Sequence, residues 1–405
     1  MKAGRDEPTL VIEALSDTPV ARRRQEIVER KGLGHPDTIC DSIVEAISID
    51  LNRMYLDQLG AIPHYNVDKA LLIAGRCAKA FGSGCVTQPM ELIVGDRATS
   101  VVGRHGLPVE DVARAAIVHW TERHLPGVRP AHDLLTRIVL APGSEELCAI
   151  YDEHAPSIAS NDSCGASGYA PLSPAEELVL AVEQYLNSAG FKARFPETGQ
   201  DVKVLGVRRD DGLALTVAMP LGCLTVLSEG AYFRRKEEIL DDLIRRFRSA
   251  PFALDWRLNC LDHPGRGTAG VYLTLTGTSA EDADSGQVGR GNRANGLIAF
   301  ARPTGGEATA GKNPVAHAGK IYSVLSHRLA ALVHARCPEL QEVYVHLAVR
   351  IGERVDRPWT GVQAVVSPGA SLGDFEPAIH EVIATELARI GEFRAELIRG
   401  EHRGC

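Results

Sequence analysis

The chain has no long apolar run. Nothing in its 405 residues approaches the roughly 18 consecutive apolar residues of a membrane-spanning helix. The first eight residues, Met1–Pro8, are charged and lack the apolar core of a signal peptide. We therefore expect a cytoplasmic protein without a membrane partner.

Cysteine is present, but not in patterns that bind metal or form a disulfide framework. The nine cysteines include no C-x-x-C pair and no Cys/His cluster with zinc spacing. An odd number without a secretion signal fits reduced thiols in a cytosol.

Basic charge is also in deficit, since the net charge is −8 and the pI about 6.0. A general nucleic-acid binder is thereby disfavoured, and any anion must be held locally.

What is present is the composition of a globular protein, with 44% hydrophobic and 24% charged residues. A chain this long predicts two or three domains or one multi-lobed unit. Long helices separated by strand pairs favour an α+β fold over strict βαβ alternation. Helices are predicted from periodicity and capping signals over about 36–60, 173–190, 233–248, 314–332 and 377–398. Strands are predicted at 71–74, 202–207, 213–219, 271–276 and 343–351, the second and third as a hairpin.

One window reverses the acidic balance. Between Val288 and Lys320 the only acid is Glu307, and glycines alternate with five cations: Arg290, Arg293, Arg302, Lys312 and Lys320. Glycine lets backbone N–H groups approach a ligand closely, and Arg and Lys beside such turns suit a polyphosphate. A solvated Gly-rich surface loop is the alternative interpretation.

The segment Glu29–Asp37 is a Gly-containing turn that leads into a helix N-terminus, where unpaired N–H groups attract anions. His35 there could stabilise charge on a leaving oxygen, and Asp37 could hold a divalent cation. Alternatively, Asp37 only complements the helix dipole and His35 only forms the turn.

Further candidates occur along the chain. Asp201 and Lys203 lie on one face of a predicted strand, as a structural ion pair or as a metal ligand with a phosphate-binding lysine. Asp162 could face a ligand or form a turn. Gly306–Asn313 nearly matches the phosphate-loop pattern, but Asn replaces the metal-binding hydroxyl and no strand abuts the first glycine.

Taken together and in this order, these motifs resemble the methionine adenosyltransferase (S-adenosylmethionine synthetase) family in its archaeal-type branch. The resemblance runs from about Glu26 to Gly352 and more weakly to the C-terminus. The matching segments are 26–41, 168–173, 201–204, 276–281, 289–293 and 311–315.

The resemblance implies that ATP and L-methionine give S-adenosylmethionine, with the released triphosphate hydrolysed to pyrophosphate and phosphate. It implies a pair of Mg²⁺ ions held by Asp37 and Asp284, and leaves a dependence on K⁺ open. Glu29 and Asp162 are implied to line the adenosine and methionine side. The implied catalytic residues are His35, Lys203, Arg290 and Lys312. The implied triphosphate-binding residues are His35, Asp201, Lys203, Arg290, Arg293, Lys312 and Lys320.

The family also implies three similar α+β lobes around a pseudo-threefold axis, discontinuous in sequence. We expect residues 1–20 to be a flexible segment, 21–400 to be one catalytic unit and 401–405 to be a tail. A homodimer with active sites between subunits is implied, and further pairing of dimers stays open.

The methionine half departs from the family pattern. Arg76, Pro142 and Gly165 replace a histidine, a glutamine and an aromatic residue, and Thr304–Glu307 replaces a Met-rich segment. Either the pocket has drifted while accepting methionine, or it prefers a methionine analogue.

Two other functional classes remain as alternatives: a P-loop ATPase or kinase, and a non-catalytic nucleotide-binding relative.

Overall fold

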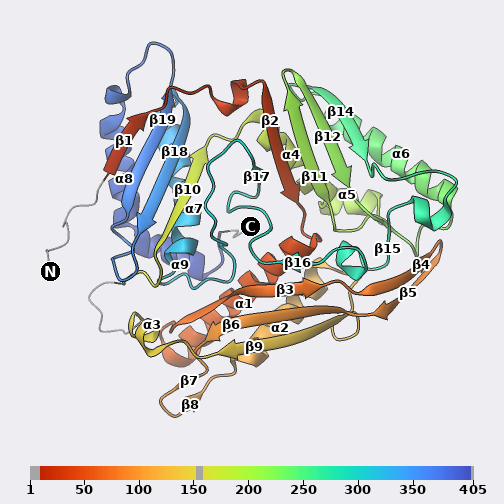
Figure 1. The fold of residues 1–405 in the computed structure, drawn as a ribbon, viewed down its shortest axis with the longest axis horizontal. Helices are drawn as coiled ribbons and strands as arrows, with labels where there is room; N and C mark the ends of the chain where they lie inside the picture. The colour runs from red at the N-terminus through yellow and green to blue at the C-terminus, as the bar shows by residue number, and fades with distance from the viewer. Residues whose placement is uncertain (1–9, 152–157, 403–405) are drawn as a thin grey trace.

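A computed structural model describes residues 10–151 and 158–402. The described helices and strands form three sheet-and-helix lobes, each with its own hydrophobic core (Figure 1). The predicted α+β class is confirmed. The pseudo-threefold axis and the assignment of 21–400 to one catalytic unit stay predictions.

The first lobe carries α1 (Pro36–Leu59) and α2 (Val109–His124) on its sheet. The sheet has the order β16 (Gly286–Gln287), β3 (Tyr65–Ile73), β6 (Met90–Ala98) and β9 (Leu134–Ala141). The other elements of this part of the chain are the hairpins β4 (Arg76–Ala80) with β5 (Ser83–Gln88) and β7 (Val101–Val102) with β8 (His105–Gly106), and the short helix α3 (Glu145–Ala149).

The second lobe has a five-stranded sheet, in the order β14 (Ala253–Leu258), β12 (Gly212–Ala218), β11 (Lys203–Arg209), β2 (Gln25–Lys31) and β17 (Ile298–Ala299). Its helices are α4 (Pro174–Leu186), α5 (Ala189–Arg194) and α6 (Glu229–Arg246). A small parallel pair, β13 (Leu221–Gly222) with β15 (Leu273–Thr274), adjoins it.

The third lobe joins the two ends of the chain. Its sheet has the order β1 (Leu10–Ala14), β19 (Trp359–Val366), β18 (Leu340–Val349) and β10 (Cys164–Ala170), and its helices are α7 (Ala318–Arg336), α8 (Glu376–Ala388) and α9 (Ile390–Ile398). Because β1 pairs in parallel with β19, the expectation of a flexible segment over 1–20 is wrong for residues 10–14. Residues 1–9 and 403–405 lie outside the described part.

Local sequence explains why α1 starts and stops where it does. The His35 side chain caps its N-terminus, Pro36 occupies the first turn, and Gly60 ends it in the left-handed region at φ 76°. The helix is buried over most of its circumference because it packs against both the first sheet and the neighbouring α2. The turn that precedes α1 is therefore attached to a long, buried helix.

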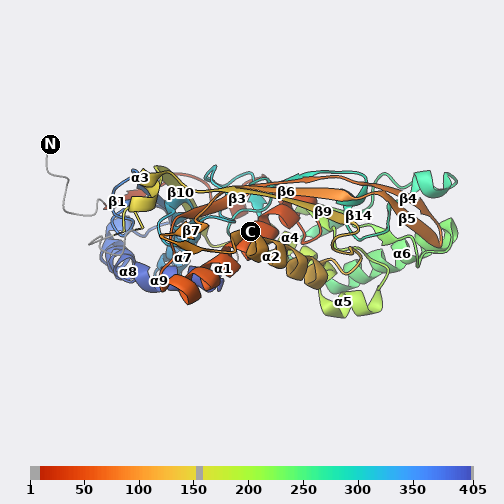
Figure 2. The same ribbon diagram turned by 90° about the horizontal axis from the view of Figure 1, so that it is seen from below.

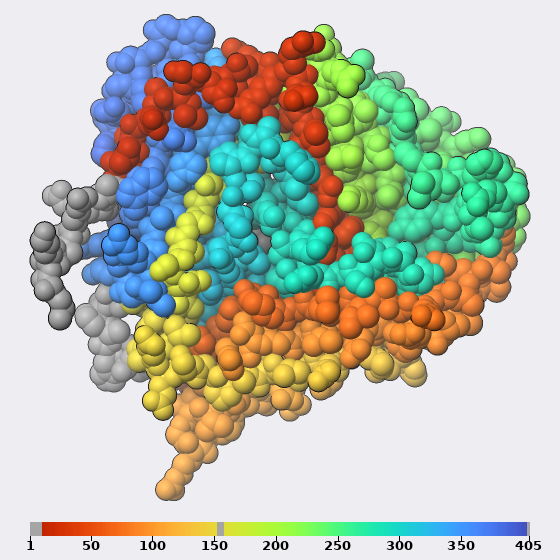
Figure 3. Space-filling model, viewed as in Figure 1, coloured from red at the N-terminus to blue at the C-terminus, as the bar shows by residue number. Residues whose placement is uncertain are grey.

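Strands and helices lie in separate layers. Figure 2 shows the long helices on one side of the molecule and the strands on the other, with only the short α3 on the strand side, so each sheet keeps one face free of long helices. The segment between β15 and α7 fills the centre among the lobes on the strand side (Figure 3). Among the described residues, no helix is both long and apolar enough to span a bilayer.

Candidate active site

The turn between β2 and α1 is fastened to the segment before β11. Gly32 N donates to Val202 O at 2.6 Å and Gly34 N to Gln200 O at 3.0 Å. A Cβ on Gly34 would lie 2.4 Å from the Gln200 carbonyl carbon, so only glycine permits this approach. Two segments with predicted site residues are therefore held side by side.

His35 leaves this turn as a buried, neutral side chain. Its Nδ1 accepts a hydrogen bond from Asp37 N at 3.2 Å, so the ring proton lies on Nε2. Burial lowers the pKa of His35 to about 4, with Lys31 and Lys203 acting in the same direction and Asp37 opposing them. At neutral pH the imidazole can donate one hydrogen bond without carrying a charge.

Two lysines face each other across neighbouring strands. Lys31 of β2 pairs directly with Lys203 of β11 in the antiparallel register, which places both side chains on the same sheet face. Lys31 Nζ lies 2.9 Å from Asp37 Oδ2, and Lys203 Nζ lies 3.4 Å from Glu29 Oε1. Like charges directly opposite each other are unfavourable. The carboxylates of Asp37 and Glu29 compensate the charges of the two lysines, and an added anion would also be attracted.

The glycine-rich loop reaches the same place. Lys31 Nζ donates to Arg290 O at 2.7 Å, while the Arg290 side chain is exposed. Gln287 N donates to Asp37 Oδ1 at 2.9 Å. We call Glu29, Lys31, His35, Asp37, Asp201, Lys203, Asp284 and Arg290 the front cluster.

Asp201 and Asp284 belong to it through Ser279. Ser279 N donates to Asp201 Oδ2 at 2.8 Å, and Asp284 N donates to Ser279 O at 3.1 Å. Burial, with a smaller contribution from the nearby Asp284 charge, raises the pKa of Asp201 to about 6. The carboxylate pair thus has negative charge that a cation would relieve.

Lys312 and Asp162 lie in a second group. Lys312 Nζ pairs with Glu307 and lies 3.5 Å from Asp68 Oδ2. Asp162, Glu307 and Lys312 all act on the pKa of Cys164, which burial raises. Asp162 also forms a turn, since its Oδ1 accepts from Ser163 N at 2.7 Å.

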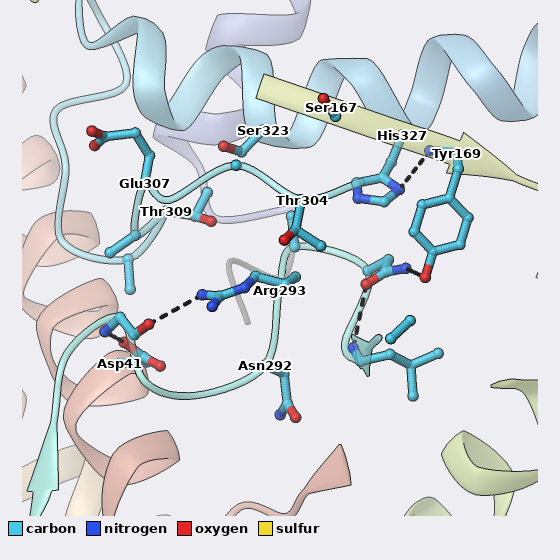
Figure 4. Close-up of a pocket in the computed structure, with 18 residues that line it drawn as sticks. Asp41, Ser167, Tyr169, Asn292, Arg293, Thr304, Glu307, Thr309, Ser323 and His327 are labelled. Atoms are coloured by element: carbon cyan, nitrogen blue, oxygen red, sulfur yellow. Dashed lines mark hydrogen bonds between the residues drawn. The ribbon is translucent and has the colours of Figure 1, made fainter. Parts of the chain in front are cut away.

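The structure separates two other candidates from the front cluster. Lys320 is 1% exposed, and its ammonium is bound by both Glu45 oxygens. Arg293 donates to Gly289 O at 3.1 Å and lines a central cavity of about 30 Å³ (Figure 4). That volume holds about one water and no triphosphate. Burial raises the pKa of Asp41, another residue of this cavity, to about 7.

Comparisons with known proteins identify the family of this chain. The family model described as S-adenosylmethionine synthetase (AdoMet synthetase) matches residues 8–401. The chain belongs to the S-adenosylmethionine synthetase family.

Individual relatives match along nearly the whole chain. The S-adenosylmethionine synthase of Pyrobaculum neutrophilum is 40% identical over 97% of this chain and 99% of its own length. That of Aeropyrum pernix is 39% identical over 97% and 98%. A solved structure, an unusual S-adenosylmethionine synthetase from Campylobacter jejuni, covers 91% of this chain and 88% of its own with a TM-score of 0.57. At 15% identity it supports the fold alone.

The alternative P-loop interpretation is not favoured in a synthetase of this fold. The local structure also lacks its strand–loop–helix geometry, because Lys312 forms an isolated bridge with Asn66 and α7 begins only at Ala318.

The residues of the front cluster fit a hard divalent cation. Carboxylates are the oxygen ligands that Mg²⁺ prefers, and it is commonly held by one or two of them together with phosphate oxygens. No group of three His, Cys, Asp or Glu side chains with metal-binding geometry occurs within 10–151 and 158–402. Phosphate oxygens would therefore have to complete the coordination.

Sequence reasoning missed Lys31, Asp68 and Glu45. The signal for Lys31 was available, because Glu29 and Lys31 alternate on one strand face as Asp201 and Lys203 do. Asp68 and Glu45 gave none, since their lysine partners are more than 200 residues away in sequence.

Proposed function

We propose that this protein is a methionine adenosyltransferase. In the proposed reaction the methionine sulfur attacks C5′ of ATP, forms S-adenosylmethionine and displaces the whole triphosphate. Hydrolysis of the triphosphate to pyrophosphate and phosphate follows before release. The proposal rests on the family membership and on one observation: Lys31 and Lys203 oppose each other beside the Arg290 loop.

The proposed reaction does not depend on general acid–base catalysis. A thioether is an uncharged nucleophile and has no proton to lose, so no general base is needed. The barrier lies in aligning sulfur with C5′ and in stabilising charge on the departing oxygen. Lysines and an arginine held in place before the reaction meet the second requirement.

His35 has a specific part in this proposal. Its neutral ring would donate the Nε2 proton in a hydrogen bond to the bridging oxygen as charge develops there. Because burial keeps the imidazole neutral, it can donate a hydrogen bond, and transfer of the Nε2 proton is unfavourable since it would leave an imidazolate anion. Lys203 and Arg290 would hold the outer phosphates, with Lys312 contributed from the second group.

Magnesium would be held by Asp37 and Asp284, and when bound it supplies positive charge to the phosphates. Removing it with EDTA should abolish product formation. We expect a pair of ions per site and treat K⁺ as a separate question, answered by activity in K⁺ against tetramethylammonium buffers.

We also propose a homodimer in which the uncovered sheet faces meet. Those faces expose large apolar side chains: Val11, Ile27, Leu71, Leu135, Val139, Val207 and Trp359. Contiguous apolar patches on a soluble protein mark interfaces. Glu29 and Lys31 share the β2 face with Ile27, so a second copy seated there would cover the front cluster.

Such a dimer would place active sites between subunits. Dilution to monomer, followed by sedimentation and assay, should abolish activity. A fully active monomer would contradict this arrangement.

The decisive test of the reaction is product identity. The protein is incubated with ATP, methionine and Mg²⁺, nucleosides are identified by mass spectrometry and phosphorus products by NMR. We expect S-adenosylmethionine, pyrophosphate and phosphate. ADP would instead indicate an ATPase or kinase, and ATP binding without product a non-catalytic relative.

The residues on the methionine side of the site determine which substrate is accepted. Arg76 and Pro142 are exposed, and a Cβ on Gly305 would lie 3.3 Å from Gly165 O. We propose that methionine is still accepted. A panel of methionine analogues compared by kcat/KM tests this, since a clear preference for an analogue would assign a specialised substrate.

A further inference from the structure

A chain of buried hydrogen bonds runs behind the front cluster. Arg30 Nε donates to Glu183 Oε2 at 2.7 Å, and Asn187 Nδ2 donates to Glu183 Oε1 at 2.7 Å. At its two ends, Arg30 Nη1 donates to Gly296 O, and Asn187 Nδ2 donates to Gln200 O at 3.2 Å. We call Arg30, Glu183 and Asn187 the rear chain.

Each link holds a segment that carries front-cluster residues. Arg30 lies on β2 between Glu29 and Lys31, and its side chain points to the opposite, helix-covered face. Gln200 directly precedes Asp201. Gly296 closes the loop that begins with Arg290.

Glycine contacts show how tightly the rear chain is packed against these segments. A Cβ on Gly32 would lie 2.8 Å from Glu183 Oε1 and 2.9 Å from Asn187 Nδ2. A Cβ on Gly296, whose φ is 85°, would lie 2.8 Å from Arg30 Nη1. Movement of the rear chain must therefore move the turn, the loop or both.

Two members of the rear chain, Arg30 and Glu183, are enclosed, whereas Asn187 is half-buried. The side chains of Arg30 and Glu183 are 11% and 3% exposed. A planar guanidinium can bind a carboxylate and a carbonyl at once, which makes Arg30 a rigid link between two segments. Glu183 joins it to Asn187 because a carboxylate accepts on both oxygens.

We propose that Arg30, Glu183 and Asn187 are positioning residues that set the spacing among Lys31, Lys203 and the Arg290 loop. The inference rests on the proposed function, because that spacing matters for a departing triphosphate. Misplacement of a catalytic group by about 1 Å costs roughly 10²-fold in rate. A purely structural role would change stability and leave turnover of the folded enzyme intact.

The experiment compares Asn187→Leu with Gln184→Ala, an exposed neighbour on α4 that takes no part in the rear chain. For Asn187→Leu we expect kcat to fall roughly 10- to 100-fold, with KM for methionine within about twofold because the methionine side is not moved. Binding of inorganic tripolyphosphate with Mg²⁺, measured by calorimetry, should weaken as well. Gln184→Ala should match wild type in all three.

A second pair of variants keeps the test informative if Asn187→Leu unfolds. Asn187→Asp sets two carboxylates against each other, and adding Glu183→Gln supplies an amide donor between them again. We expect kcat to drop in the first and recover in part in the second. Wild-type kcat and tripolyphosphate affinity in a folded Asn187 variant, even with a lower melting temperature, would overturn the proposal.

Failure of the proposed function looks different. In that case the wild-type protein makes no S-adenosylmethionine, while the tripolyphosphate measurement still reports whether the rear chain orders an anion site.

Discussion

Two buried lysines, Lys312 and Lys320, are both held by carboxylates, but their surroundings differ. Lys320 is paired with Glu45, which also accepts from Gly311 N at 3.0 Å, so the pair is locked inside the protein. Lys312 is paired with Glu307, whose side chain is 35% exposed. A carboxylate at the surface can be displaced by a ligand phosphate, whereas an enclosed one cannot.

Lys312 and Lys320 are therefore expected to have different functions. Lys320 and Glu45 anchor the backbone at Gly311, directly before Lys312, so we expect them to support the loop. Lys312 remains a proposed ligand contact because Glu307, the closer of its two carboxylate partners, can move away while the buried Asp68 stays 3.5 Å from its ammonium. Charge and spacing in the sequence do not distinguish the two, since both lysines sit in the same Gly-rich basic window.

The largest effect should come from removing the enclosed lysine. Lys320→Met leaves the Glu45 carboxylate buried without its cation, which typically costs about 3–5 kcal/mol of stability. Urea unfolding measures the loss. Lys69→Met is the matched control, because Lys69 pairs with Asp68 but is 65% exposed, and such pairs contribute about 0–1 kcal/mol.

The double variant Glu45→Gln/Lys320→Met removes both charges and should regain most of the lost stability. If Lys320→Met were as stable as Lys69→Met, the enclosed pair would not be the anchor that we infer.

The elements that could be predicted from the sequence are those whose signals lie within a few neighbouring residues. The helix start at Pro36 and the C-cap at Gly60 are local signals, so α1 was predicted nearly to its ends. The predicted hairpin is confirmed as β11 and β12 for the same reason. The predicted helix over 377–398 proved to be two, α8 and α9, and α2 was missed although its first turn is acidic and its last basic.

Long-range pairing could not be predicted in this way. β17 joins β2 across about 270 residues of sequence, and the rear chain joins Arg30 to Glu183 across 153. Motif order, through the family resemblance, supplied every member of the front cluster except Lys31. It also grouped Arg293 and Lys320 with the phosphate-binding residues, and only the three-dimensional structure shows that Lys320 is buried and that Arg293 is half-buried beside a small cavity.

The next largest effect concerns the open cations. Lys203→Ala and Arg290→Ala should each lower kcat by roughly 10²–10³ while the protein stays folded, since each removes one preorganised contact to developing charge. Arg209→Ala, an exposed cation at the other end of β11, is the control and should retain full turnover. Near-normal kcat in either site variant would remove that residue from the front cluster.

The smallest effect tests the comparison itself. Glu307→Gln removes the partly exposed partner of Lys312, a pair of a kind worth up to about 1 kcal/mol, and leaves the buried Asp68 as its remaining carboxylate, so inorganic tripolyphosphate with Mg²⁺ should bind up to about fivefold more tightly. Glu45→Gln should give no such gain, because Lys320 stays enclosed whether or not its partner is charged. Calorimetry on the two variants provides the contrast. Weaker binding in Glu307→Gln would mean that Glu307 itself faces a cationic part of the ligand, and the two lysines would then differ for another reason.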